Sequence, residues 1–280
     1  MLCVFIKSFV QVISMPIVIA LANQKGGVGK TTCNVNLAGI MSEQGYETLI
    51  LDADPQCNST SYFLDPNLSD VDTIASIYMS PITDATVHRI VRPTRIARLS
   101  IVPGGFSLSA RIWDIVQDST SGLKLKELLE AISRHRKYDF VFIDCPPDIG
   151  IFTMGAFYAA DYTIIPIQPE RLAVEGVEQL MDKIHQFWQL SKKGTPQVLG
   201  TITTMYHAQN RSHKEWAAKI QEICGDTLLG LIHRSSTVSA ASDAGRLLQE
   251  DRLNRKARPF QQHLKVIRAM LEKLRDAKRL

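Results

Sequence analysis

The sequence predicts an α/β fold, a doubly wound and mostly parallel sheet with helices on both faces. Short β-branched runs alternate with amphipathic stretches of helical length, which is typical of parallel strands buried on both faces. A glycine-rich segment, "KGGVGKTT" at 25–32, lies between the first run and the first expected helix. Two later runs end in Asp52 and Asp144, at the carboxyl edge where open parallel sheets bind ligands.

The alternation continues along the whole chain. Strands are expected at 17–22, 48–51, 99–102, 140–143, 162–167, 198–203 and 228–232, and helices near 30–44, 107–117, 122–136, 151–160, 172–190, 211–223, 240–250 and 259–278. A length of 280 residues without internal repeats suits one large α/β domain. We therefore expect a single domain over 15–280 that ends in a basic helix at 259–278. Residues 1–14 form an N-terminal extension or precede a start at Met15.

The composition excludes several classes of protein. Hydrophobic residues make up 45% and charged residues 21%, which argues against disorder or coiled coil as the main architecture. The five cysteines form no CxxC pair, which argues against a disulfide framework and a zinc site and fits a reducing, cytoplasmic setting. No apolar run approaches the about 18 residues of a spanning helix.

Positive charge is concentrated at the C-terminus. Residues 251–280 hold ten Lys and Arg against three acids, whereas the whole chain has a net charge of only +4. Within 259–278, Phe260, Leu264, Ile267, Leu271 and Leu274 fall on one helical face, with most basic residues on the other. The basic face is either simply solvated or suited to a polyanion such as DNA.

The glycine-rich segment has the features of a phosphate-binding loop. Its glycines let backbone N–H groups approach phosphates, and the following helix presents its positive end to them. Lys30 would reach the β- and γ-phosphates, and the Thr31 hydroxyl would bind Mg²⁺. The strict phosphate-loop pattern is not met because Gln24 replaces its first glycine, and a second lysine, Lys25, lies inside the loop.

Carboxylates follow two of the other expected strands. "LDADPQCNST" places Asp52 and Asp54 at a strand end, where one or both are suited to handle water or metal. "FIDCPPDIG" ends another strand in Asp144, the pattern of an aspartate that holds the water shell of Mg²⁺. Pro146 and Pro147 stop that strand abruptly, as in a segment that senses the γ-phosphate.

Together these segments resemble a known family. "NQKGGVGKTT", "LDADPQCN" and "FIDCPPDIG" are similar to the deviant Walker A, switch I and Walker B segments of the ParA partition ATPases, which are P-loop proteins of the SIMIBI type. "ADYTIIPIQPERLAVEGVEQL", "TMYHAQNRS" and "LIHRSSTVSAASDAGR" resemble later segments of the family, the last two with clear departures. The resemblance covers nearly all of residues 16–250.

The resemblance implies a cofactor pair, ATP and Mg²⁺, and roles for single residues. Lys25 would reach across an ATP sandwich dimer to the partner's ATP, and Asp54 would be needed for hydrolysis. Asp52 would help Thr31 and Asp144 to set Mg²⁺ or its waters. The expected contacts to the nucleotide come from Lys25, Gly26, Gly27, Val28, Gly29, Lys30, Thr31, Thr32, Asp54 and Asp144, with adenine near the regions of Met205 and His233.

The resemblance also implies partners. Small ParA proteins form an ATP-dependent homodimer on nucleoid DNA without sequence preference, have weak intrinsic ATPase activity, and are stimulated by a ParB-like centromere-binding protein. This chain would thus take part in plasmid or chromosome partition, as a cytoplasmic, nucleoid-associated protein without stable membrane association. Candidate DNA-binding residues are Arg211, Lys214, Arg234, Arg268 and Arg275.

Two alternatives remain open from the sequence. One is a ParA-like positioning ATPase whose cargo is a protein assembly, such as a carboxysome or a chemoreceptor cluster. The other is a MinD-like regulator that uses the basic C-terminal helix as an interfacial membrane anchor. Gln24 and the "DCPPDIG" segment favour ParA over MinD.

Overall fold

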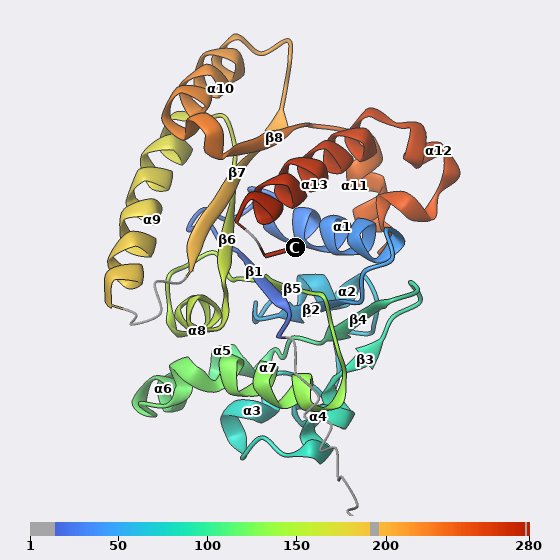
Figure 1. Cartoon of the computed structure of the whole chain (residues 1–280), viewed down its shortest axis with the longest axis vertical. Coiled ribbons are helices and arrows are strands. Elements are labelled where there is room, and N and C mark those ends of the chain that lie inside the picture. The colour runs from blue at the N-terminus through green and yellow to red at the C-terminus, as the bar shows by residue number, and fades with distance from the viewer. Residues whose placement is uncertain (1–14, 191–195, 278) are drawn as a thin grey trace, which may run out of the picture.

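The computed structural model describes residues 15–190, 196–277 and 279–280, whose strands form one eight-stranded sheet (Figure 1). The strand order is β3-β4-β2-β5-β1-β6-β7-β8. The strands are β1 Ile17–Leu21, β2 Thr48–Asp52, β3 Arg92–Pro93, β4 Leu99–Val102, β5 Phe140–Asp144, β6 Tyr162–Ile167, β7 Gln197–Tyr206 and β8 Leu228–His233. Neighbours are parallel except β3 and β4, which confirms the predicted fold class. The expected extension at 1–14 lies outside the described residues.

Helices connect the strands and cover the sheet. The longer ones are α1 Lys30–Glu43, α7 Lys124–His135, α8 Ile151–Ala159, α9 Arg171–Leu190, α10 Arg211–Cys224 and α13 Arg258–Asp276. The shorter ones are α2 Asn58–Ser61, α3 Ser76–Met79, α4 Asp84–Ile90, α5 Ser107–Ala110, α6 Ile112–Gln117, α11 Ser236–Asp243 and α12 Arg252–Lys256. Single 3₁₀ turns lie at Asp70–Asp72, Ser121–Leu123, Gly225–Thr227 and Leu248–Glu250.

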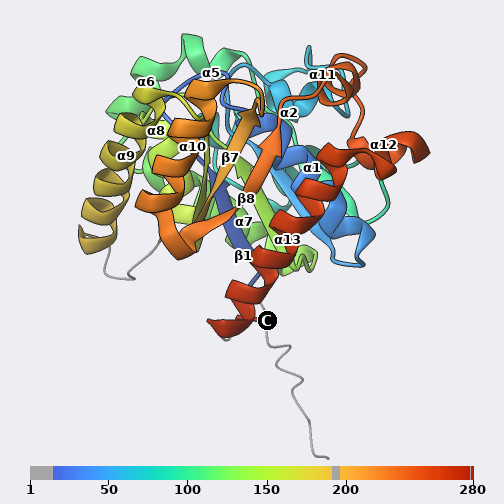
Figure 2. The same ribbon diagram turned by 90° about the horizontal axis from the view of Figure 1, so that it is seen from above.

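The sheet has a core on each face. Helices α1 and α13 cover one face, while α7, α8, α9 and α10 cover the other (Figures 1 and 2). Along β1, Ile17, Ile19 and Leu21 belong to the first core, and Val18 and Ala20 belong to the second. Because successive side chains of a strand point to opposite faces, a strand buried between two helical layers is apolar at every position.

One predicted helix, 240–250, is wrong. The structure has α11 at Ser236–Asp243, a turn, and then the 3₁₀ turn at Leu248–Glu250. The Ser235 hydroxyl accepts a hydrogen bond from Thr237 N and caps the start of α11. Gly245 has φ of +59°, a left-handed conformation that glycine adopts readily and that ends the helix.

The region between β2 and β5 is also more broken than predicted. The expected helix 107–117 is interrupted at Arg111 into α5 and α6. Short helices α2, α3 and α4 and the two-residue strand β3 were not predicted. Helix α4 had a readable signal, since Thr83 and Thr86 form a capping box at its start. The others are too short to show a hydrophobic period.

The last helix, α13, packs its apolar face into the core. Phe260, Ile267, Leu271 and Leu274 are buried there, which confirms the predicted stripe, and Leu264 is half-buried beside them. Arg268 and Arg275 lie on the exposed face of the same helix. No helix in the described part of the chain is long and apolar enough to cross a membrane.

Candidate functional site

A tight loop joins β1 to α1 at the carboxyl edge of the sheet. Gly27 and Gly29 have φ of +73° and +84°, conformations that side-chain-bearing residues rarely adopt. The buried Val28 fixes the loop through its carbonyl, which accepts a hydrogen bond of 2.8 Å from the Thr204 hydroxyl. Gly29 caps α1, so the unpaired N–H groups of the helix and the loop face the same space. Such a concentration of N–H groups is suited to bind phosphate.

The loop borders a cavity of about 370 Å³, here called the loop cavity. Its lining includes Gly26, Gly27, Gly29, Lys30, Thr31, Thr32 and Asp54. Lys30 is only 7% exposed, and burial lowers its pKa, while attraction to Asp144 opposes that shift. A lysine with so little solvent around it needs negative charge nearby, and the cavity leaves room for a polyphosphate.

The second lysine of the loop points elsewhere. Lys25 Nζ lies 2.5 Å from Glu170 Oε2, at the start of α9, in an ion pair whose side chains are 35% and 45% exposed. The Lys25 N–H donates to the Asn23 side chain, which orients this part of the loop. Among the described residues that line the loop cavity, Lys30 is present and Lys25 is not. Lys30 therefore faces the loop cavity of its own chain, and Lys25 is held outside that cavity by Glu170.

Asp144 and Thr31 meet behind the loop cavity. Asp144 is fully buried and accepts a hydrogen bond of 2.8 Å from the Ser59 hydroxyl. Burial raises the pKa of Asp144, and the nearby hydroxyls of Thr31 and Ser59 oppose the rise. Its Oδ1 atom has no hydrogen-bond partner among the described residues. A threonine hydroxyl beside a carboxylate with a spare oxygen is a fitting donor set for Mg²⁺ and its waters.

The structure does not bring Asp52 to the cavity. Asp52 pairs in register with Asp144 across β2 and β5, but its Oδ2 accepts hydrogen bonds from the N–H and the hydroxyl of Thr60, at 2.8 and 2.6 Å. Asp54, two residues on, lines the cavity and is 5% exposed. Burial raises the pKa of Asp54, and the Gln56 N–H and Lys30 oppose the rise. Asp54 is thus the carboxylate of this loop that can face a bound molecule.

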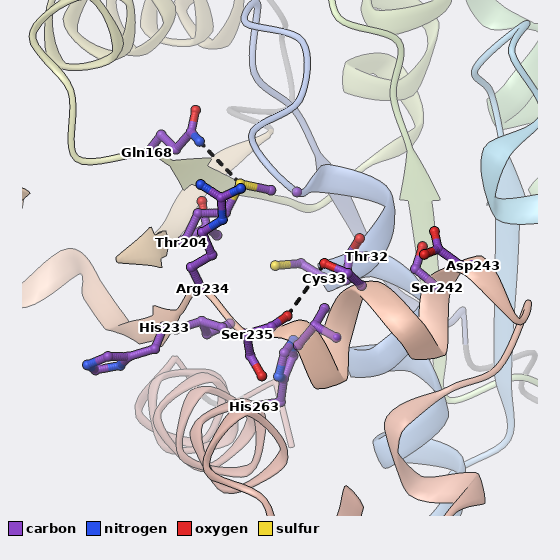
Figure 3. Close-up of a pocket in the computed structure, with 15 residues that line it drawn as sticks. Thr32, Cys33, Gln168, Thr204, His233, Arg234, Ser235, Ser242, Asp243 and His263 are labelled. Carbon is purple, nitrogen blue, oxygen red and sulfur yellow. Dashed lines mark hydrogen bonds between the residues drawn. The ribbon is translucent and has the colours of Figure 1, made fainter. Parts of the chain in front are cut away.

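A second cavity of about 350 Å³ adjoins the first and is here called the side cavity (Figure 3). The two share Gly29, Thr32, Met205 and Ser242 in their linings, so they lie side by side. Met205 and His233, the regions expected to contact adenine, both line the side cavity. A molecule with phosphates in the loop cavity would place its other end here.

Sequence reasoning missed several residues of the site. Ser59 and Thr60 hold the two buried aspartates, and Tyr62 Oη lies 2.7 Å from Ser242 Oγ, which joins the loop after β2 to α11. Ser59 and Thr60 could have been predicted, because their hydroxyls closely follow the carboxylates of the "LDADPQ" segment in the sequence. Glu170 could not have been predicted in this way, because it lies 145 residues from its partner Lys25.

The five candidate DNA-binding residues fall into two groups. Arg211 and Lys214 at the start of α10, and Arg234 after β8, are exposed at the carboxyl edge of the sheet. Arg268 and Arg275 lie along α13, whose far end approaches the amino edge, since Lys273 Nζ contacts Leu199 O at the start of β7. Figure 2 shows α10 and α13 on either side of β7 and β8. The structure therefore separates the candidates into two surfaces.

Comparison with known proteins agrees with this geometry. A family model described as "AAA domain" matches residues 17–210. The chain is 32% identical over 262 residues to the chromosome partitioning protein ParA of Caulobacter vibrioides, covering 92% of this chain and 95% of the relative.

Solved structures share the fold. The McdA(D38A)–ATP complex of Cyanothece has a TM-score of 0.77 at 22% identity, covering 93% of this chain and 97% of that one. Cobyrinic acid a,c-diamide synthase of Mycobacterium smegmatis, with bound ADP and magnesium, has a TM-score of 0.76 at 24% identity, covering 95% and 98%. At these identities the likeness shows the fold alone.

We expect the protein without nucleotide or metal to lose stability as the pH rises from about 4 towards neutral. Burial and the neighbouring Asp144 raise the pKa of Asp52 above that of an unfolded aspartate. In this window the folded protein keeps a proton that the unfolded chain has released, so the free energy of unfolding falls as the pH rises.

Asp52→Asn should make this pH dependence shallower because it removes one of two adjacent buried carboxyls. Urea unfolding at about pH 5 and about pH 7.5 measures it. The exposed Asp182→Asn on α9 is the control and should keep the slope of the unmodified protein. An Asp52→Asn slope equal to that of the control would contradict the assignment.

Proposed function

This chain belongs to the ParA family of ATPases, and on that basis we propose that it is a Mg²⁺-dependent enzyme that dimerises around two ATP molecules. The ATP-bound dimer binds nucleoid DNA without sequence preference, and a ParB-like partner stimulates hydrolysis and releases it. The cargo is a plasmid or a chromosome origin. One observation carries the proposal, namely that Lys30 faces the cavity of its own chain while Lys25 is held outside it by Glu170.

The residues of the loop cavity divide the work of hydrolysis. Loop N–H groups and Lys30 hold the β- and γ-phosphates, and Thr31 with Asp144 holds Mg²⁺ and its waters. The bound Mg²⁺ would neutralise charge on the phosphates. Asp54 is close enough to the cavity to orient the attacking water. Asp52 stabilises the same loop by accepting a hydrogen bond from Thr60, and it does not itself contact the bound molecule.

Lys25 couples nucleotide to dimerisation. A cation supplied by the partner subunit offsets phosphate charge only when two subunits close over ATP. The dimer is therefore favoured when ATP is present and loses that contact after hydrolysis. Holding Lys25 at Glu170 in the single chain keeps the lysine available at the surface.

The burial of the apolar face of α13 favours binding of this protein to DNA over binding to a membrane. Phe260, Ile267 and Leu274 are buried in the core, so they are not free to insert into a bilayer. The exposed basic residues on α10, after β8 and on α13 offer phosphate contacts instead. No feature of the described residues favours a protein assembly over DNA as cargo.

Replacing Asp54 by Ala should abolish stimulated ATP hydrolysis while ATP binding persists. The loss should be at least about 100-fold, because the attacking water is no longer oriented. ATP turnover and equilibrium binding of a fluorescent ATP analogue measure the two effects. Lys30→Ala is the matched comparison and should lose binding itself. Intact stimulated hydrolysis in Asp54→Ala would contradict the role given to Asp54.

Replacing Lys25 by Ala should abolish ATP-dependent dimerisation but leave ATP binding to the single chain within about threefold, because Lys25 lies outside its own cavity. Analytical ultracentrifugation with and without ATP measures dimerisation. Glu170→Gln is the control, since it frees Lys25 and should leave the dimer at least as stable. A Lys25→Ala chain that dimerises normally would refute action across the interface.

Reversing charge at the carboxyl edge should weaken DNA binding. We expect Arg211→Glu with Lys214→Glu to lower ATP-dependent affinity for nonspecific DNA at least about tenfold and to flatten its salt dependence. Arg268→Glu with Arg275→Glu carries the same charge change on α13. Its effect should be smaller, because the two subunits close over ATP at the carboxyl edge of the sheet and the far end of α13 lies near the amino edge. Fluorescence anisotropy at two salt concentrations measures both. Unchanged affinity in the α10 pair would exclude this surface.

A further inference from the structure

Arg95, in the turn between β3 and β4, ties together two segments that line the cavities. Its Nη1 donates a hydrogen bond of 2.6 Å to the carbonyl oxygen of Tyr62, and its Nη2 donates one of 2.7 Å to that of Gly245. Tyr62 follows α2, and Gly245 follows α11. The N–H donors of a guanidinium form a rigid planar fork, so Arg95 holds the two carbonyl groups in a fixed relation.

The guanidinium of Arg95 is itself held in place. Both carboxylate oxygens of Glu250 accept from it, with Nε at 2.6 Å and Nη2 at 2.8 Å, which makes the pair bidentate. Glu250 is only 18% exposed and also accepts a hydrogen bond from Leu247 N. The guanidinium also lies 5.5 Å from the centroid of the Phe63 ring. These contacts distinguish Arg95 from the partner in an isolated surface ion pair.

The two tied segments meet where the loop cavity and the side cavity adjoin. Tyr62 Oη lies 2.7 Å from Ser242 Oγ. Tyr62 lines the loop cavity, and Ser242 lines both cavities. Burial raises the pKa of Tyr62, and the nearby hydroxyls of Ser242 and Thr32 oppose the rise. Figure 3 shows Thr32 on α1 and Ser242 on α11, the two helices that Tyr62 thus approaches.

Arg95 is suited to orient these groups and not to bind a ligand itself. Among the described residues that line either cavity, Arg95 is absent. The two segments that it joins already pack closely, since a Cβ at Gly245 would lie 3.4 Å from the carbonyl oxygen of Ser61. Loss of Arg95 would leave this packing and the bond between Tyr62 and Ser242 to hold the segments together.

We propose that Arg95 is a positioning residue that holds Tyr62 against Ser242 and so keeps the junction of the two cavities in the shape that ATP requires. This inference rests on the proposed ATPase function, because it takes ATP to fill both cavities. A site that already has its bound shape loses less free energy when the ligand orders it. Inorganic tripolyphosphate would fill the loop cavity alone, held by the loop N–H groups and Lys30, and should depend little on this junction.

The test compares Arg95→Ala with Arg92→Ala in the same hairpin. The side chain of Arg92 is also 40% exposed and forms an ion pair with Asp72, and neither residue is among those that line the two cavities. Direct titration of a fluorescent ATP analogue with Mg²⁺, followed by competition, measures the affinity of each variant for ATP and for tripolyphosphate. Arg95→Ala should weaken ATP about tenfold and tripolyphosphate less than about twofold, whereas Arg92→Ala should change either by less than about twofold.

Tyr62→Phe removes one hydroxyl and tests whether Arg95 acts through the contact with Ser242. The double variant with Arg95→Ala should bind ATP within about twofold of Arg95→Ala alone, because both changes act on the same contact. Arg95→Lys keeps the charge but loses the forked donors, so it should show the same contrast between the two ligands. It carries the test if Arg95→Ala does not fold.

Unchanged ATP affinity in Arg95→Ala, equal weakening of ATP and tripolyphosphate, or the same loss in Arg92→Ala would overturn the assignment while the ATPase function stood. Independent effects of Arg95→Ala and Tyr62→Phe would also overturn it, because Arg95 would then act elsewhere. If the unmodified protein bound neither ATP nor tripolyphosphate, the proposed function itself would be refuted, and the role of Arg95 with it.

Discussion

The site depends on the parallel register of β1, β2 and β5. Because these three strands are neighbours and run in the same direction, their carboxyl ends reach one edge together. Asp144 pairs in register with Leu21 on one side and Asp52 on the other. The loop after β1, the carboxylates after β2 and Asp144 are thereby brought within reach of one another. Shifting β1 against β5 would separate Thr31 from Asp144, and shifting β2 against β5 would separate Asp52 from Asp144.

The same register places two buried carboxyl groups next to each other, which is unfavourable, and neighbouring hydroxyl groups compensate by hydrogen bonding to them. Two fully buried aspartates lie side by side, and burial raises the pKa of both. Hydroxyls of Thr60 and Ser59 each donate to one of them, and Lys30 adds positive charge nearby. Buried charges are tolerated when they are hydrogen-bonded and paired. Helix α2, Asn58–Ser61, therefore stabilises the site through Ser59 and Thr60, which are not among the residues that line the loop cavity.

What the sequence could predict was local. The glycine loop, Asp54 and Asp144 follow directly from short segments at strand ends, and the sheet follows from the β-branched runs. The helix 240–250 was wrong because Gly245 and the cap at Ser235 outweighed the apolar pattern. Glu170, just before α9, and His263, on α13, reach the site only through tertiary packing, and no spacing in the sequence connects them with the loop at 25–32.

The exposure of the Lys25–Glu170 ion pair has a consequence for reversibility. Exposed pairs of this kind contribute about 0–1 kcal/mol, which shifts an equilibrium by less than about tenfold. Any other contact of Lys25 must therefore replace the ion pair with Glu170, which costs only this small free energy. Glu170 acts as a weak ligand within the same chain that competes with a phosphate group for Lys25. Once a phosphate that Lys25 has contacted departs, the carboxylate is the nearest replacement. An interface closed by this lysine can then reopen without leaving an unpaired cation behind.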